Sequence, residues 1–381
     1  MFKLKPCEAK TPVSTIFAVE GVKGNDGSFN RLLELMDRGG LRFYKSKSRG
    51  LLQDPDGLIA ADDVVLVKVN SQWDECGMTN TDVVKAITAA VLAHPEGFKG
   101  EVVVADNGQG QYGSTGHGGR LDYAINNAED RSQSVIRVVE SFKGLGKVSA
   151  FSWDTITEKE VREYSEGDTE DGYVLANKAD PLTGVMPSYP KFKTENGTLV
   201  SFKKGVWNPA KSKYEGGRLK VINTPVLKSH FIFGVTGAVK GYMGVPSDKL
   251  TATRGFRTHP TVGKGGMGTL MTETRIPTLN VLDAVNVNAK PGTGPNTPFD
   301  GATHAGVLAA STDPVALDYW ASKNILCVLA KEKYGADVSP FDPDNATKGC
   351  FGDWLKLAAA RLNEAGRSFT LDEEEISVRV A

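Results

Sequence analysis

The chain has 381 residues, and its 45 lysines and arginines nearly balance 46 aspartates and glutamates, which gives a formal net charge of -1. This balance argues against a protein that works mainly by binding nucleic acid or an anionic membrane, and the sequence has no apolar run of about 18 residues that would cross a bilayer. Hydrophobic residues at 40% and charged residues at 24% are typical of a globular protein, whereas the 42 glycines are unusually many.

The first 152 residues predict alternating strands and helices. Short β-branched runs bounded by turn residues indicate buried parallel strands. Val64–Val69 and Glu101–Ala105 are the clearest of these, and Val13–Val19 is weaker. Between the two clear strands, apolar residues recur at helical spacing over Thr81–Ala93, where we expect Thr79 to cap a helix.

Residues 153–217 have a different character. They are polar, rich in Lys, Glu, Gly and Pro, and weakly patterned. We therefore interpret them as an insertion or a small subdomain that divides an α/β core into a first part, residues 1–152, and a second part, residues 218–381.

The second part of the core again alternates strands and helices. Leu219–Asn223 and Leu279–Leu282 predict strands, with Ile376–Val380 as a weaker candidate. Asp313 followed by Pro314 predicts a capped, buried helix start, and residues 353–365 predict another helix. The sequence thus predicts an α/β fold with a mixed, mostly parallel sheet and helices on both faces.

Polar residues follow the four clearest strands, and in open α/β sheets ligands bind beyond the carboxyl ends of strands. We expect these residues to converge on one site, although polar residues also belong at strand ends for structural reasons. They are Lys68 near the end of the first strand and Asn70 after it, Asp106 after the second, Lys228 and His230 after the third, and Asp283 after the fourth.

The segment after Asp106 is rich in glycine. Gly108–Gly113 matches G-x-G-x-x-G, but no helix begins directly after it, so a dinucleotide site lacks its usual context. A backbone nest for a smaller anion and a plain flexible loop both stay open. Gly108, Gly110 and His117 are the candidate ligands of this loop.

Lys228 and His230 lie two residues apart, which in extended chain places both side chains on one face. The lysine would fix an anionic substrate and keep the histidine neutral for proton transfer. In the following Gly234–Gly244, glycines recur every three or four residues, and in a helix Thr236 and Lys240 would be neighbours. Close packing and an oxyanion or phosphate site are alternative explanations of these glycines. His259 is a further binding candidate.

Four cysteines, Cys7, Cys76, Cys327 and Cys350, are far apart and form no CxxC pair. The chain itself therefore lacks the closely spaced thiolates of a zinc ribbon or an iron–sulfur cluster. Scattered cysteines fit a reducing cytoplasm, with a removed export signal left open. HExxH, GxSxG and Walker A motifs are absent from the sequence.

The order of these motifs resembles the domain-of-unknown-function family 362 (DUF362). The resemblance spans roughly residues 64–326, and its most specific block joins Pro225–His230 to Gly234–Lys240. The supporting segments are Lys68-Val-Asn70, VVVADNG, Leu279–Ala284 and Asp313–Asp318. Many members carry appended ferredoxin-like cysteine clusters, which this chain lacks, and the chain also departs from the family at Val69 and in its long polar insertion.

Two classes of function fit this sequence. The first, which we favour, is an enzyme that binds a small anionic carboxylate or phosphate. Lys68, Asn70, Gly108, Gly110, His117, Thr236, Lys240, His259 and Asp283 would bind the substrate, and Lys228, His230 and Asp106 would act as catalytic groups. A divalent metal on Asp106 or Asp283 is left open.

The second class is a non-catalytic accessory or redox-partner protein that binds a cofactor or an iron–sulfur protein, and a catalytically idle relative is a third option. The sequence does not determine the oligomeric state.

Overall fold

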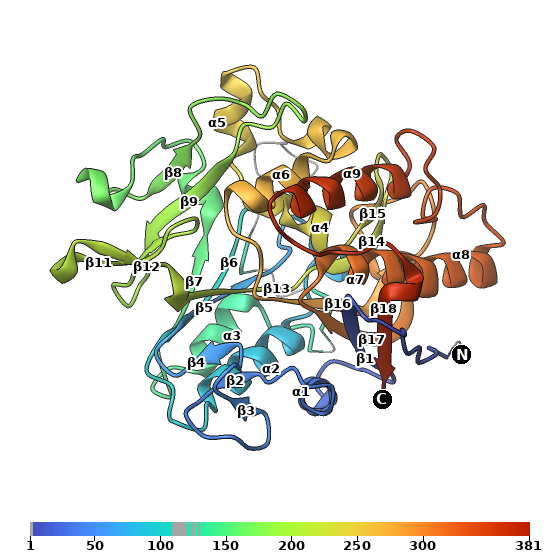
Figure 1. Ribbon diagram of the computed structural model, residues 1–381, viewed down its shortest axis with the longest axis horizontal. Helices are drawn as coiled ribbons and strands as arrows, with labels where there is room; N and C mark the ends of the chain where they lie inside the picture. The colour runs from blue at the N-terminus through green and yellow to red at the C-terminus, as the bar shows by residue number, and fades with distance from the viewer. Residues whose placement is uncertain (1–2, 109–119, 123–125, 129) are drawn as a thin grey trace.

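A ten-stranded sheet forms the centre of the computed structural model, which describes residues 3–108, 120–122, 126–128 and 130–381 (Figure 1). Eight strands follow one another in the order β18-β1-β17-β16-β13-β5-β6-β7, while β14 pairs with β16 and β15 pairs with β14. The strands are β1 (Ser14–Val19), β5 (Val64–Lys68), β6 (Glu101–Asp106), β7 (Val148–Ser152), β13 (Leu219–Asn223), β14 (Val226–His230), β15 (Gly234–Thr236), β16 (Leu279–Asn288), β17 (Thr303–Ser311) and β18 (Ile376–Val380).

The sheet is mixed but mostly parallel, as the sequence predicts. Strands β16, β13, β5, β6 and β7 run parallel to one another, whereas β17 is antiparallel to both β1 and β16. All six predicted strands are present. Five differ from the prediction by at most one residue at an end, whereas β16 continues beyond the predicted Leu282 to Asn288.

Helices cover both faces of the sheet. Successive strand side chains point to opposite faces, and on β5 Val64 and Leu66 enter one hydrophobic core while Val65 and Val67 enter another. The second core also contains residues of α1 (Ser28–Arg38), α2 (Thr81–Leu92) and α3 (Val135–Ser141). The first contains residues of α4 (Ala238–Gly241), α6 (Gly266–Glu273), α7 (Pro314–Ala321), α8 (Cys327–Tyr334) and α9 (Phe351–Glu364).

Residues 153–217 contain a second sheet, which is antiparallel and lies at one end of the main sheet (Figure 1). Its buried aromatic side chains, among them Trp153, Phe192 and Phe202, belong to the same hydrophobic core as β5 and α4. The strands in order are β12 (Lys213–Glu215), β11 (Gly205–Asn208), β10 (Leu199–Ser201), β9 (Ser188–Lys193) and β8 (Gly172–Leu175). Other elements are a small sheet of β2 (Tyr44–Lys45), β3 (Gln53–Asp54) and β4 (Ile59–Ala60), the short helix α5 (Asp248–Thr253), several 3-10 helices and a π-helix, Ser322–Leu326.

Two local predictions need correction. Asn80, and not Thr79, caps α2 through a bond from the Asp82 N–H to its side chain. The Gly234–Gly244 segment is not one helix: it forms β15, α4 and a 3-10 turn, Tyr242–Gly244. The predicted cap of α7 is confirmed, because the Asp313 carboxylate accepts from the N–H groups of Val315 and Ala316.

None of the helices in the described part of the chain combines the length and the apolar character needed to cross a membrane.

Candidate functional site

A cavity of about 820 Å³ opens beyond the carboxyl ends of β5, β6 and β14. Its volume lies within the roughly 300–1,000 Å³ typical of small-molecule sites. The cavity therefore has room for a small organic ligand. Its lining residues are Asn70, Gln72, Trp73, Asp106, Asn107, Lys228, His230, Phe231, Ile232, Phe233, Thr236, Lys240, Gly241, Met243, Gly244, Arg257, His259, Pro260, Gly294, Pro295 and Asn296.

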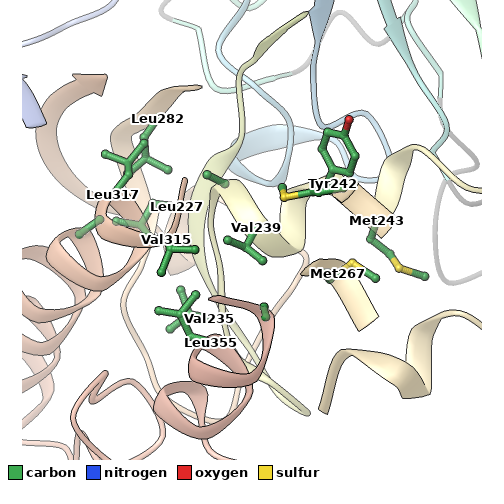
Figure 2. Packing of buried hydrophobic residues seen from close by; sticks show 14 of the residues in the cluster. Leu227, Val235, Val239, Tyr242, Met243, Met267, Leu282, Val315, Leu317 and Leu355 are labelled. Carbon is green, nitrogen blue, oxygen red and sulfur yellow. The ribbon is translucent and has the colours of Figure 1, made fainter. Parts of the chain in front are cut away.

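The β14–β15 hairpin brings the basic side chains to this cavity. Lys228 and His230 lie on one face of β14, and Lys228 is paired in register with Thr236 on β15. The alternate residues Leu227 and Val235 belong to the hydrophobic core, where Figure 2 shows them beside α4 and the helices of the C-terminal half. Strand alternation thus separates the cavity face of the hairpin from its core face.

Lys228 is buried, and its ammonium group is hydrogen-bonded to a backbone carbonyl. Its Nζ donates to the Gly77 carbonyl over 2.5 Å. Burial, with a smaller contribution from the positive charge of Lys68, lowers the pKa of Lys228 to about 7, while Asp106 and Asp283 oppose the shift. Its ammonium therefore exchanges its proton near neutral pH.

Lys240 is also buried, but its surroundings are different. Its Nζ lies 5.4 Å from the centre of the Phe233 ring, and no carboxylate of the described residues forms an ion pair with it. Burial lowers the pKa of Lys240 to about 7, and the like charge of Lys228 adds to the effect. The nearby Thr236 hydroxyl has no hydrogen-bond partner among the described residues.

His230 and His259 form an aromatic group beside Lys240. Their rings are 5.8 Å apart and roughly perpendicular, and Phe233 packs against both. Burial, followed by Lys240, His259 and Lys228, lowers the pKa of His230 well below its usual range, and burial and Lys240 lower that of His259 to about 3. Both rings are therefore neutral at physiological pH, and His230 Nδ1 accepts the Ile232 N–H over 3.2 Å.

Lys68 and Asp106 form a buried ion pair at the base of the site. Lys68 Nζ lies 2.9 Å from Asp106 Oδ1 and donates to the carbonyls of Val69 and Gly241. Asp106 Oδ2 accepts from the N–H and the hydroxyl of Ser71. Burial raises the pKa of Asp106, whereas Lys68 and Ser71 oppose the rise. Lys68 is not among the lining residues, so it acts on the cavity through Asp106 and Gly241.

Asp318 does not line the cavity, but it supports the turn that carries Lys240, and the sequence did not indicate this role. Its carboxylate accepts the N–H groups of Ala238 and Val239, the first two residues of α4, and so fixes the turn that carries Lys240. Burial raises its pKa to about 7. The available signal was an aspartate inside a helix that is otherwise apolar on most faces.

Close packing accounts for three glycines of the Gly234–Gly244 segment. A Cβ at Gly237 would lie 2.7 Å from Asp318 Cγ, and one at Gly241 would lie 2.9 Å from a Pro225 carbon. A Cβ at Gly244 would lie 2.7 Å from Lys68 Nζ. The packing alternative therefore applies to all three positions, although Gly241 and Gly244 also line the cavity.

The other predicted site residues divide into three groups. Asn70 and His259 line the cavity, and the Asn70 side chain also accepts the Val226 N–H that begins β14. Asp283 and Gly108 do not line it: Asp283 accepts from Asn80, Asn127 and Val285, and the Gly108 N–H donates to Asp154. Gly110 and His117 lie outside the described residues.

Several lining residues carried no signal in the sequence. Trp73 has an indole N–H without a hydrogen-bond partner among the described residues, and Arg257 is exposed at the cavity. Phe231 and Ile232 are 60% and 54% exposed at the turn of the hairpin. Trp73, Phe231 and Ile232 give the cavity an apolar wall, and Arg257 adds to its basic groups.

The donor set of the described residues does not fit a metal or an iron–sulfur cluster. Within the described ranges, no three His, Cys, Asp or Glu side chains gather as potential ligands of one ion. The described cysteines are all free thiols, and none lines the cavity. We therefore derive no step through such a group.

The family resemblance is confirmed for the segment that builds most of this site. Residues 219–323 match the model of the family described as Domain of unknown function (DUF362). No curated protein and no solved structure matches the chain. The matched segment contains Lys228, His230, Thr236, Lys240 and Asp318.

Proposed function

We propose that this chain is an enzyme that binds a small organic anion, a carboxylate or a phosphate, in the cavity beyond β5, β6 and β14. The observation that carries the proposal is the pair of buried lysines, Lys228 and Lys240, in one cavity of about 820 Å³. Burying an ammonium group without a counter-charge is costly, and a bound anion removes that cost.

The charges around the cavity support an anionic ligand. Asp106 is the only carboxylate among the described lining residues, and Lys68 already neutralises it. Lys228, Lys240 and the exposed Arg257 then leave an excess of positive charge. Phe231, Ile232 and the other apolar lining residues would contact the carbon skeleton of the ligand.

We assign the proton transfer to the lysines. A group with a pKa near the working pH is the most effective acid–base catalyst, and both Lys228 and Lys240 have a pKa of about 7. His230 has a pKa too low for an effective base, and its Nδ1 already accepts a hydrogen bond, so its Nε2–H is a donor to the anion. Asp106 holds Lys68 and Ser71 and so organises the base of the site.

A thermal-shift screen tests the proposal. Acetate, lactate, pyruvate, inorganic phosphate and a phosphate monoester are compared at equal ionic strength, and each hit is measured by titration calorimetry. We expect Lys228→Met and Lys240→Met each to weaken binding at least tenfold, whereas the exposed Lys213→Met control binds like the wild type. An absence of binding by every anion, or equal binding by all three variants, contradicts the proposal.

An accessory role for an iron–sulfur protein partner is the alternative. The observation that favours it is the exposed apolar pair, Phe231 and Ile232, at the turn of the hairpin, because exposed apolar patches often mark contact sites. This role predicts a complex with a small ferredoxin that Phe231→Ser/Ile232→Ser abolishes, together with no shift in the anion screen.

We further propose that the protein works in the cytoplasm without nucleic acid or membrane partners. The four free cysteines support a reducing compartment, and the balanced net charge supports the absence of polyanionic partners. Fractionation of cells that express the tagged full chain tests the compartment.

A further inference from the structure

We propose, on the basis of the anion site described above, that Lys240 is a nucleophile that forms an imine with the carbonyl group of an oxo acid or a phosphorylated aldehyde. The substrates of the proposed enzyme would then be anions that also carry a reactive carbonyl group. It also gives the two lysines of the cavity different tasks.

Comparison of the buried lysines separates Lys240 from the others. Four lysines are buried in the described part of the chain: Lys68, Lys191, Lys228 and Lys240. Lys68 pairs with Asp106, Lys191 donates to Asp168, and Lys228 donates to Gly77. Lys240 has no hydrogen bond or ion pair with a described residue; its Nζ lies over the Phe233 ring.

An amine in such surroundings is suited to nucleophilic attack. A lysine that is desolvated in an apolar pocket beside another cation is activated because its neutral form is favoured. The pKa of Lys240, lowered to about 7 by burial and by Lys228, agrees with this environment. Lys228 Nζ is instead held by the Gly77 carbonyl, which suits it to bind the carboxylate or phosphate and to exchange a proton with the substrate.

The backbone around Lys240 is fixed in place. Asp318 accepts the N–H groups of Ala238 and Val239, and the Asn223 side chain donates to the Ala238 carbonyl. A nucleophile held on a well-anchored turn keeps its geometry toward the substrate. The unpartnered Thr236 hydroxyl lies in the same cavity and is available to the carbonyl oxygen.

The step balances without an oxidant or a reductant. The lone pair of neutral Lys240 attacks the carbonyl carbon and forms a C–N bond, while the carbonyl oxygen takes a proton from the Lys228 ammonium. The nitrogen returns a proton to Lys228, and the hydroxyl group, protonated once more from solvent, leaves as water. The product is the protonated imine, and hydrolysis reverses the reaction.

Borohydride trapping tests this inference with two matched pairs of probes. Pyruvate and pyridoxal phosphate carry a carbonyl, whereas lactate and pyridoxine phosphate are the corresponding alcohols. Each probe is incubated with the full chain and sodium borohydride, and the modified lysines are identified by peptide mass mapping. We expect a reduced adduct of at least one carbonyl probe on Lys240, formed roughly tenfold to a hundredfold faster near pH 7.5 than at exposed Lys213.

Variants and pH separate this chemistry from ordinary lysine labelling. Lys240→Arg should keep the positive charge and anion binding but lose the adduct, and Lys240→Met should lose both. Lys228→Arg keeps the positive charge but cannot exchange the protons of the step, so it should still be trapped at Lys240, only more slowly. The trapping rate at Lys240 should level off above about pH 8, whereas the rate at exposed lysines should rise toward their pKa of about 10.4.

The outcomes distinguish this inference from the proposed function. Thermal shifts with lactate and pyruvate, but no Lys240 adduct with either carbonyl probe, overturn the imine and leave the anion site standing. Adducts spread evenly over exposed lysines also overturn it. No binding of any of the four probes contradicts the proposed function and this inference together.

Discussion

The buried pair of Lys68 and Asp106 gives the sharpest test of how the site is built. Replacement of Lys68 by Met keeps an unbranched side chain of similar length but removes the ammonium group. Asp106, which is 2% exposed in the wild type, then keeps the two hydrogen bonds from Ser71 as its only ones from the described residues. The variant also loses the bonds from Lys68 to the carbonyls of Val69 and Gly241.

The expected loss follows from the burial of both partners. Removing one member of a buried ion pair costs about 3–5 kcal/mol of unfolding free energy, because the remaining charge has no partner. Ser71 still stabilises the carboxylate, so we expect about 3 kcal/mol for Lys68→Met. The exposed pair of Lys203 and Glu273, with side chains 41% and 56% exposed, supplies the control. Lys203→Met should cost less than about 1 kcal/mol.

The loss should also depend on pH. Burial raises the pKa of Asp106, and without Lys68 less opposes the rise. The folded variant then holds a proton that the unfolded chain releases above pH ~4, so its stability falls as the pH rises from there toward the folded pKa. The deficit relative to the wild type should therefore be larger at pH 8 than at pH 5.

Urea denaturation of Lys68→Met, Asp106→Asn and the double variant Lys68→Met/Asp106→Asn measures these effects. The double variant should lose less than the sum of the single losses, because no charge is left without a partner. The reasoning is refuted if Lys68→Met costs no more than Lys203→Met, or if the two single losses simply add.

Three further expectations concern the packing and the charges of the cavity. Gly244→Ala should cost about 1–3 kcal/mol in urea denaturation, because its Cβ would press on the Lys68–Asp106 pair; Gly217→Ala, where nothing lies within 4 Å, is the control, and equal losses would contradict this. Affinity for acetate or phosphate, measured by calorimetry, should fall as the pH rises from 6 to 9, because Lys228 and Lys240 lose their charge near pH 7; unchanged affinity would argue against binding by these groups. Lys240→Met should raise the stability of the ligand-free protein by about 1–3 kcal/mol at pH 6 and by less at pH 10. The reason is that the folded pKa of Lys240 lies below its unfolded value, so the wild type gains stability as the pH rises from about 7. If the variant shifts the denaturant midpoint equally at the two pH values, this sign is wrong.

Local signals in the sequence were sufficient for most of the main fold. The strands β5, β6 and β13 and the start of β16 are β-branched runs that are buried on both faces, a pattern that predicts a strand from neighbouring residues alone. The Asp313-Pro314 start of α7 is a capping interaction between neighbours in the chain, so it too is readable locally. The structure of the Gly234–Gly244 segment could not be predicted in this way. Its glycines are required because a Cβ there would come too close to Asp318, Pro225 or Lys68, which belong to other segments of the chain.

The sequence by itself determined the type of fold, the resemblance to DUF362 and the presence of basic groups near the strand ends. Only the tertiary structure decided which of those groups share a cavity. Lys68 and Lys228 both follow the pattern of a polar residue at a strand end, yet Lys68 is paired beneath the cavity and Lys228 lines it. The reason is physical: burial and partner choice depend on contacts between distant segments, and these set the charge, the pKa and the access of each side chain.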